Sequence, residues 1–324
     1  MEIQDRVYKT IIVDEPVIAE VIESAPMQRL KKISQDGPPH LIQPQRNVNR
    51  FEHSVGVWYL SKLFNRPIEE QLACLIHDVP HTAFSHVIDF VVEDERHEYH
   101  ERFTEKIIKE SEVPEILKRQ GVDLDVVLEK HRYPLLENDL PDISFDRWDY
   151  FMRDGFMFGL LPQLFVDEFI SGVKERDGRL YFPDMRLASS FAILFMSFSR
   201  LIWLDPTSHG AFLLFAKALK RALELGVISE DDFFTDDETV MQKLQSTNDD
   251  EIRTLLEKLS PGKEFSYASE SESDYYSSNK PRFVDPLVEV EGELVRLSDK
   301  ITNFKEYFSE FATNYKMIGV KQNL

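Results

Sequence analysis

The sequence predicts a mainly α-helical protein with a smaller mixed α/β part at its C-terminal end. Three observations support this fold class. Apolar residues recur at three-to-four-residue spacing in most of the first 226 residues, which is typical of amphipathic helices. Residues 281–299 instead alternate between apolar and polar, as strands do. The 324 residues are 42% hydrophobic and 30% charged, which supplies enough apolar material for a large core.

The expected helices of the first half begin and end at recognisable signals. Asn49 with Glu52 three residues later forms a capping box at the start of the second helix. Asn65 is a candidate cap for the third, with Pro67 in its first turn. Pro80 disfavours helical backbone at the residue before it, so that helix should end after residue 78. The expected helices are residues 15–34, 51–64, 65–78, 99–110, 144–155, 189–204 and 209–226.

The C-terminal part has a different pattern. Residues 171–182 predict a hairpin that turns at Asp177-Gly178. Residues 260–280 are rich in Ser, Tyr and Glu and predict irregular or strand-like structure, and the acidic runs before them predict solvated surface. We therefore divide the chain into an N-terminal core at residues 1–175 and a C-terminal helical extension with short strands at residues 176–324.

Charge and composition exclude several kinds of partner. With 38 basic and 58 acidic residues the net charge is −20, which argues against binding to duplex nucleic acid. No apolar run reaches the ~20 residues that span a bilayer, and the N-terminus carries acids where a secretory signal is basic and then apolar. A single cysteine excludes an internal disulfide. We therefore expect a cytoplasmic protein without a membrane partner.

Six of the nine histidines lie close together in the chain. They are His53, His77, His81, His86, His97 and His100. The stretch "LIHDVPHTAFSH" puts a His-Asp pair at the end of an apolar helix, where an unpaired imidazole and carboxylate would be costly to bury. A shared cation removes that cost for both. One histidine in such a helix is more often an ordinary core residue, but a group this dense indicates a site.

The types of ligand narrow the choice of metal. Without a cysteine cluster a structural zinc site is excluded. Two imidazoles with carboxylates suit Fe, Mn, Zn, Co or Ni, and Mg less well, so we expect one divalent metal ion. His77 and Asp78 supply two ligands and His53 can supply a third. Spacing alone does not choose a fourth among the 58 acidic residues.

Four segments in order resemble the HD-domain phosphohydrolases, which are named for this His-Asp pair. They are "RFEHS" at 50–54, "HD" at 77–78, "FSH" at 84–86 and "FDRWDYFMRD" at 145–154. "MQRLKKISQDG", "DGRLYF" and "RFVDPLV" resemble further elements of the branch of deoxynucleoside-triphosphate triphosphohydrolases. The likeness is dense from residue 27 to 155, and it implies an HD-domain helical bundle.

The resemblance also implies a role for each matching residue. The metal ligands would be His53, His77, Asp78 and Asp146. His81 and His100 would serve the chemical step, with Asp89 orienting the catalytic imidazole. The substrate would contact Arg50, His86, Arg147, Tyr150, Asp154 and Gln35. Asp146, Tyr150 and Asp154 recur every four residues and would form one polar stripe on a helix.

We therefore expect metal-dependent hydrolysis of a phosphoester or phosphoanhydride in a small nucleotide-like substrate, with a deoxynucleoside triphosphate as one candidate. Asp205 and Pro206 stand where that branch has a basic pair, and the branch's glycine-rich insertion before "RFEHS" is missing. The alternatives are a phosphomonoesterase or phosphodiesterase for another small phosphate, and a non-catalytic nucleotide-binding module. The very apolar helices at 189–204 and 209–226 favour a homo-oligomer.

Overall fold

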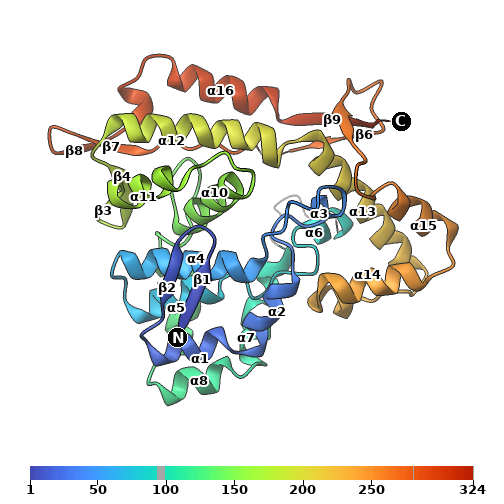
Figure 1. The fold of residues 1–324 in the computed structure, drawn as a ribbon, viewed down its shortest axis with the longest axis horizontal. Coiled ribbons are helices and arrows are strands. Elements are labelled where there is room, and N and C mark those ends of the chain that lie inside the picture. The colour runs from blue at the N-terminus through green and yellow to red at the C-terminus, as the bar shows by residue number, and fades with distance from the viewer. Residues whose placement is uncertain (93–98, 280, 324) are drawn as a thin grey trace.

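The computed structural model describes residues 1–92, 99–279 and 281–323. Figure 1 shows the N-terminal hairpin and the first helices at one end of the molecule and two long helices, α12 and α16, at the other. Helices α14 and α15 project to one side. The mainly α-helical fold with a smaller strand-containing C-terminal part is confirmed.

The first half is built from short helices. They are α1 (Pro16–Ile22), α2 (Ala25–Arg29), η1 (Leu30–Lys32), α3 (Pro39–Ile42), α4 (Arg50–Leu63), α5 (Ile68–Ile76), α6 (Val87–Val92), η2 (Tyr99–Phe103), α7 (Thr104–Lys109), α8 (Val113–Arg119), α9 (Leu124–Leu128), η3 (Lys130–Arg132), α10 (Phe145–Met157) and α11 (Gln163–Gly172). An antiparallel hairpin of β1 (Glu2–Asp5) and β2 (Lys9–Ile12) precedes them.

The second half carries longer helices and two small sheets. Its helices are α12 (Met185–Phe198), the π-helical turn η4 (Ser199–Trp203), α13 (Pro206–Glu224), η5 (Glu230–Phe234), α14 (Asp237–Ser246), α15 (Asp250–Glu257), η6 (Leu297–Asp299) and α16 (Phe304–Asn314). Its strands are β3 (Lys174–Arg176), β4 (Arg179–Phe182), β5 (Phe265–Tyr267), β6 (Tyr275–Ser278), β7 (Leu287–Val290), β8 (Glu293–Arg296) and β9 (Met317–Gln322).

Two of the expected helices differ from the structure at prolines. The single helix expected at 15–34 is wrong: it breaks after α1, and α2 restarts at Ser24 with Pro26 in its first turn. Proline has no N–H to continue the earlier helix. Asn65 is not a cap, because it adopts a left-handed turn (φ 51°) and α5 begins only after Pro67.

The helix starts and turns that depend on local chemistry are as expected. Asn49 and Glu52 form the capping box of α4. Asp177 and Gly178 both have positive φ, 52° and 72°, and join β3 to β4 in a tight hairpin. The acidic runs were expected to be solvated surface, but two of their residues have a structural role. Asp236 and Asp249 cap α14 and α15 by accepting backbone N–H groups. Carboxylates at these positions satisfy N–H groups that the helix itself leaves free.

The strands form two separate sheets in the C-terminal part. One has the order β3-β4-β7-β8, in which β4 and β7 are parallel. The other has the order β5-β9-β6 and is antiparallel. Both sheets therefore combine segments that are more than 40 residues apart in sequence.

Buried side chains form two hydrophobic clusters. In one, α13 packs against α3, α6 and α15 and against β5 and β9. In the other, α4 packs against α5 and α10, and the core continues through α12 to α16. The helices α4, α5 and α10 carry the predicted metal ligands or end beside them, so this packing brings distant parts of the chain together. The division at residue 175 stays a prediction.

Residues Met185–Trp203 form a helix that is long and apolar enough to cross a membrane by length and composition alone. Half of its apolar window is buried inside the protein. The core helix of a soluble protein passes the same test, so this is weak evidence for a membrane span.

Candidate metal centre

The start of α4 carries two of the predicted site residues. Asn49 Oδ1 accepts the Glu52 N–H at 2.9 Å, and a Glu52 oxygen accepts the Asn49 N–H at 3.2 Å. This cap fixes where the helix begins, so that Arg50 and His53 both lie in its first turn. Both side chains are buried, and His53 is completely so.

The His-Asp pair follows the end of α5. His77 is the C-cap residue of the helix, and its Nδ1 hydrogen-bonds to the Cys74 carbonyl at 2.8 Å. That bond makes Nδ1 the protonated nitrogen and leaves Nε2 as a bare lone pair. His77 Nε2 is buried and has no hydrogen-bond partner among the described residues. It lies 3.4 Å from Asp78 Oδ1.

Helix α10 brings the fourth residue. Ser144 caps this helix by accepting the Arg147 N–H, and Asp146 follows in the first turn. Asp146 Oδ1 lies 3.0 Å from His53 Nε2 and 3.9 Å from His77 Nε2. His53 Nε2 lies 3.7 Å from Asp78 Oδ2. The structure therefore brings the four predicted metal ligands, from three separate segments, into one group, which we call the HD cluster.

The electrostatics of the HD cluster favour a cation. Burial would lower the pKa of His53, but its hydrogen bonds to Asp146 and Asp149 and the charge of Asp78 outweigh burial and raise the pKa to about 10. Burial would raise the pKa of Asp78, yet the Arg50 guanidinium beside it holds the pKa well below its usual range. Burial lowers the pKa of His77, so its imidazole stays neutral. Two imidazole nitrogens and two carboxylates are a donor set that fits a divalent transition metal.

Behind the HD cluster lies a network that the sequence did not reveal. His53 Nδ1 donates to Asp149 Oδ2 at 2.8 Å, which leaves Nε2 toward the cluster. Arg153 donates to the same oxygen at 2.6 Å and to Asp5 of the N-terminal hairpin at 2.9 Å. Asp149 and Arg153 are fully buried. Carboxylates behind a ligating histidine fix its orientation and raise its basicity.

Gly56 makes room for this network. A Cβ at this position of α4 would lie 1.9 Å from Asp149 Oδ1 and 2.3 Å from Arg153 Nη2. The only sequence signals were the i, i+4 spacing of Asp149 and Arg153 and one glycine inside a helix. Neither distinguishes a buried ion pair from an exposed one, so sequence reasoning missed all three residues.

A second group of three histidines lies next to the cluster. The rings of His81 and His100 stack with centroids 3.7 Å apart, and the His86 ring lies 4.8 Å from that of His81. His81 Nε2 is 3.2 Å from Asp78 Oδ1, which joins the two groups. Burial lowers the pKa of His81 and lowers that of His100 to about 3, so both imidazoles are neutral at pH 7.

Asp89, the predicted orienting acid, contacts a histidine of the second group. Asp89 Oδ2 lies 3.1 Å from His86 Nδ1. The His86 ring lies edge-on to those of His81 and His100, so the Asp89 carboxylate holds the histidine that packs against this pair. His97 lies outside the described residues.

The predicted substrate residues lie in several environments. Arg50 donates to Asp78 Oδ2 at 2.7 Å and to Ser85 Oγ at 2.8 Å, directly beside the HD cluster. Arg147 donates to Asn138 Oδ1 at 2.8 Å and to the Asn138 and Asp142 carbonyls, so its guanidinium is bound to the loop before α10. A phosphate-binding role for Arg147 stays a prediction.

The polar stripe of α10 continues beyond Asp146. The Tyr150 ring packs 5.1 Å from the Trp203 ring, and Trp203 Nε1 donates to Asp154 Oδ2 at 2.6 Å. Burial, followed by the charge of Asp36, raises the pKa of Asp154 to about 8. Gln35 Oε1 and Asp154 Oδ1 are buried and have no hydrogen-bond partner in the part of the chain that the structure describes. The Gln35 oxygen can accept a hydrogen bond from a ligand, and Asp154, whose carboxyl is mostly protonated at pH 7, can donate one through Oδ1.

Asp205 plays a structural part. Its carboxylate accepts the Ser208 N–H at 3.0 Å and so caps α13. Asp205 stands where the triphosphohydrolase branch has a basic residue, and here its carboxylate is held at the start of α13.

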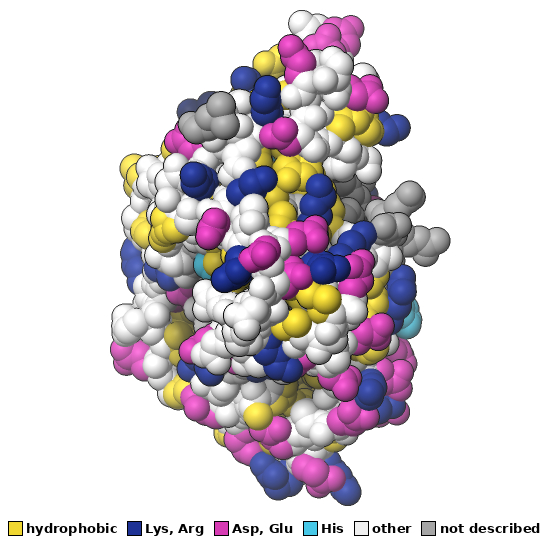
Figure 2. Space-filling view, turned by 90° about the vertical axis from the view of Figure 1, so that its right-hand side faces the viewer, with side chains coloured by type: hydrophobic (Ala, Val, Ile, Leu, Met, Phe, Trp, Pro, Cys, Tyr) yellow, Lys and Arg dark blue, Asp and Glu magenta, His cyan; other side chains and the backbone are white. Residues whose placement is uncertain are grey.

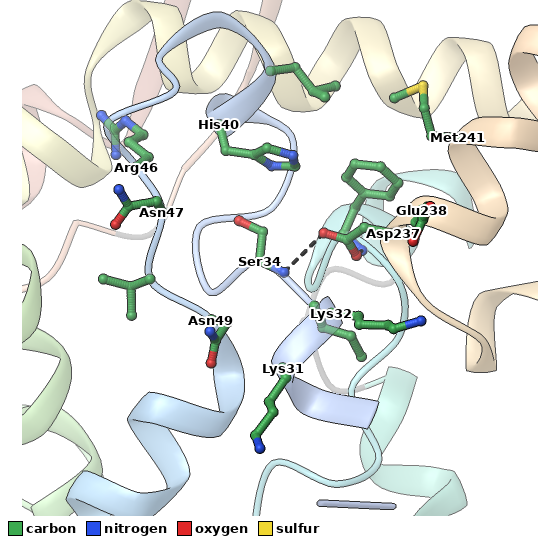
Figure 3. A pocket seen from close by; sticks show the side chains of 14 residues that line it. Lys31, Lys32, Ser34, His40, Arg46, Asn47, Asn49, Asp237, Glu238 and Met241 are labelled. Carbon is green, nitrogen blue, oxygen red and sulfur yellow. Dashed lines mark hydrogen bonds between the residues drawn. The ribbon is translucent and has the colours of Figure 1, made fainter. Parts of the chain in front are cut away.

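A pocket of about 430 Å³ opens near the start of α4 (Figure 3). Residues 31–34 and 46–49, His40, Phe84 and the start of α14 line it. Asp237 accepts the backbone N–H groups of Ser34 and Phe84 at 2.9 and 2.6 Å and ties α14 to this wall. None of the predicted site residues lines the pocket, so it is separate from the HD cluster.

Replacement of Asp149 by Ala is expected to weaken metal binding by about ten- to a hundredfold, because His53 would lose the acceptor that orients it. Competition with a chromophoric chelator would measure the affinity. Asp167→Ala, which removes an exposed carboxylate paired with Lys9, is the matched control. Equal affinities of the two variants would contradict the role of Asp149.

Gly56→Ala is expected to lower the free energy of unfolding by about 1–3 kcal/mol, because the added methyl group overlaps the Asp149–Arg153 pair. Chemical denaturation of the metal-free protein would measure the loss. An unchanged midpoint would show that the pair moves aside without cost.

Metal binding is expected to release a proton near neutral pH. Because the pKa of His53 is raised to about 10, this side chain is protonated in the metal-free chain, and a metal ion at Nε2 must displace that proton. Calorimetry in two buffers of different ionisation enthalpy would detect it, and His53→Gln should abolish the release. Heats that do not depend on the buffer would refute this assignment.

The raised pKa of His53 also makes the free energy of unfolding of the metal-free chain depend on pH. The pKa of His53 in the folded chain lies above its ordinary value of 6.5. The protonated His53 therefore contributes its full stabilisation to the metal-free chain below pH 6.5. This stabilisation should be lost as the pH rises toward about 10. Thermal unfolding of the metal-free chain across this range would show the decline.

The comparisons with known proteins agree with this geometry. Residues 50–154 match the family model of the HD domain. The chain is similar to the uncharacterized protein YdhJ of Bacillus subtilis, at 34% identity over 94% of this chain and 95% of that protein. It is 28% identical to the metal-dependent phosphohydrolase cns2 of Cordyceps militaris, over 70% of this chain and 68% of that protein.

More distant similarities point the same way. The deoxynucleoside triphosphate triphosphohydrolase SAMHD1 of Mus musculus is 26% identical over 48% of this chain and 31% of its own length. The fold matches the crystal structure of a phosphohydrolase from Bacteroides thetaiotaomicron with a TM-score of 0.75 over 99% of both chains, at 18% identity. The four residues of the HD cluster all fall within the matched segment. This chain therefore belongs to the HD-domain family of metal-dependent phosphohydrolases.

Proposed function

We propose that the protein hydrolyses a phosphoester or phosphoanhydride bond in a small nucleotide-like substrate, with a deoxynucleoside triphosphate as one candidate. The observation that carries this proposal is the convergence of His53, His77, Asp78 and Asp146 from three segments. We propose these four residues as the ligands of one divalent ion, which is Fe, Mn, Zn, Co, Ni or Mg. When bound, such an ion supplies a Lewis acid for a phosphoryl oxygen and lowers the pKa of water.

The neighbouring histidines are proposed to handle protons. His81 and His100 are neutral at pH 7 because burial lowers the pKa of both. A neutral imidazole can accept a proton from an attacking water. Their Nδ1 atoms are buried without a hydrogen-bond partner among the described residues, so both retain bonding capacity. Asp89 would act on this group through its contact with His86.

The remaining predicted residues are proposed to bind the substrate. Arg50 already lies beside Asp78 and presents a guanidinium at the cluster, a fork that suits phosphate oxygens. Tyr150 and Asp154 would contact the sugar or base, since they follow Asp146 at four-residue spacing along α10. Gln35, whose buried side-chain oxygen has no hydrogen-bond partner among the described residues, is proposed to bind the substrate with them. His86 and Arg147 complete the proposed set.

The substrate remains the open part of the proposal. The similarity to the mouse triphosphohydrolase supports a deoxynucleoside triphosphate. The capping role of Asp205 and the proline after it leave that position without the basic pair of the triphosphohydrolase branch. This observation favours the second candidate, a phosphomonoesterase or phosphodiesterase for a shorter phosphate. A non-catalytic nucleotide-binding module is the third.

We further propose that the protein acts in the cytoplasm, as a homo-oligomer, on a small soluble substrate. The net charge of −20 opposes duplex nucleic acid. Figure 2 shows acidic and basic side chains interspersed over one face, with no gathering of basic side chains into a single stripe. We also propose the division into a core at residues 1–175 and an extension at residues 176–324.

Replacement of both His77 and Asp78 by Ala is expected to abolish metal binding and hydrolysis, because two of the four proposed ligands are lost. Metal content and product release from a panel of deoxynucleotides and generic phosphate esters would be measured. Inorganic triphosphate as product indicates the first candidate, orthophosphate or a nucleoside monophosphate the second, and binding without product the third. Full activity and metal content in the double variant would refute the assignment.

A further inference from the structure

Residues 281–286, which precede β7, are held against the end of α12 and the loop before α10. The Arg282 N–H donates to Ser199 Oγ at the end of α12, and the Asp285 N–H donates to the Pro141 carbonyl before α10. Val284 between them is completely buried. The Asp285 carboxylate accepts both the N–H and the hydroxyl of Ser298. The backbone of Arg282 is therefore fixed between two elements of the site.

The side chain of Arg282 lies over the polar stripe of α10. Its guanidinium carbon is 5.5 Å from the centre of the Tyr150 ring. Tyr150 is one helical turn beyond Asp146, and its ring also packs edge-on against that of Trp203. The charge of Arg282 also lowers the pKa of His86, after burial and Arg50. The guanidinium is thus close enough to Tyr150 on α10 and to His86 for its charge to act on both side chains.

The other arginines around the site already have anionic or carbonyl partners. Arg50 pairs with Asp78, Arg46 with Asp36, and Arg153 with Asp149 and Asp5. Arg147 is bound to the loop before α10. Within residues 1–92, 99–279 and 281–323, no carboxylate lies within 4.0 Å of the Arg282 guanidinium. Its side chain hydrogen-bonds to Tyr150, and a half-buried guanidinium with no carboxylate beside it among these residues can receive an anion.

We infer that Arg282 binds a phosphate group of the substrate. The C-terminal part of the chain thereby supplies a positively charged side chain, which Asp205 and Pro206 do not supply. The inference rests on the proposed phosphohydrolase function. A planar guanidinium above Tyr150 can form two parallel hydrogen bonds with one phosphate. Arg282 is a substrate-binding residue in this assignment and takes no part in holding the metal.

Inorganic phosphate is the probe, because its binding can be followed without turnover. We expect Arg282→Ala to weaken the binding of inorganic phosphate to the manganese-loaded protein, and to raise KM for a generic phosphate ester, by about ten- to a hundredfold. Metal affinity and the thermal midpoint should stay at the wild-type values. Arg282→Lys should recover part of the loss, since it keeps the charge without the fork. Arg186→Ala, which removes an exposed arginine on α12, is the control.

The outcomes separate the inference from the function on which it rests. If Arg282→Ala binds phosphate as the wild type does, while the wild type hydrolyses esters, the inference fails and the function stands. If Arg282→Lys is as defective as Arg282→Ala and both melt earlier, the arginine is a packing residue on Tyr150 and the inference fails. If the manganese-loaded wild type neither binds phosphate nor hydrolyses any ester, both fail.

Discussion

The concentration of negative charge around two buried imidazoles is the constraint on which this structure depends. Asp78, Asp146 and Asp149 all lie within about hydrogen-bond reach of His53 or His77. Asp78 and Asp149 are buried, whereas the Asp146 side chain keeps 26% of its surface exposed. Arg50 and Arg153 neutralise part of this charge from outside. The remaining negative charge lies around the Nε2 atoms of His53 and His77. Either a proton on His53 or a divalent cation offsets this charge. A metal site is thus built into the charge balance of the fold.

The scaffold holds these groups through packing that is shared between distant segments. Helices α4, α5 and α10 form one core, and each contributes a side chain or an end to the HD cluster. The absence of a side chain at Gly56 lets the Asp149–Arg153 pair approach α4. The pair in turn reaches Asp5 in the N-terminal hairpin, so the first strand supports a ligand about fifty residues away in sequence. Metal affinity and global stability are coupled through this network.

The substrate side of the site draws on the second half of the chain. Trp203 ends the π-helical turn η4 and donates to Asp154, while Arg282 approaches Tyr150 from the segment before β7. Irregular helical turns of this kind often occur at functional positions because they re-aim a side chain. The proposed metal ligands lie within the segment that matches the HD domain, whereas Trp203 and Arg282 lie outside it. This division explains why family membership identifies the reaction class before the substrate.

The sequence by itself determined what depends on local chemistry: the capping box at Asn49, the Asp177-Gly178 hairpin, the mainly helical class and, through ordered motifs, the HD family. It predicted one continuous helix through Pro26, where the structure has a break, and it took the capping acids Asp236 and Asp249 for surface charge. Only the tertiary structure decided which charges are buried and paired. It bound the guanidinium of Arg147 to the loop before α10, and it placed Asp89 beside His86 and Asp149, Arg153 and Arg282 around the site. The physical reason is that the partner of a charged side chain is set by packing between segments far apart in the chain, which residue spacing does not encode.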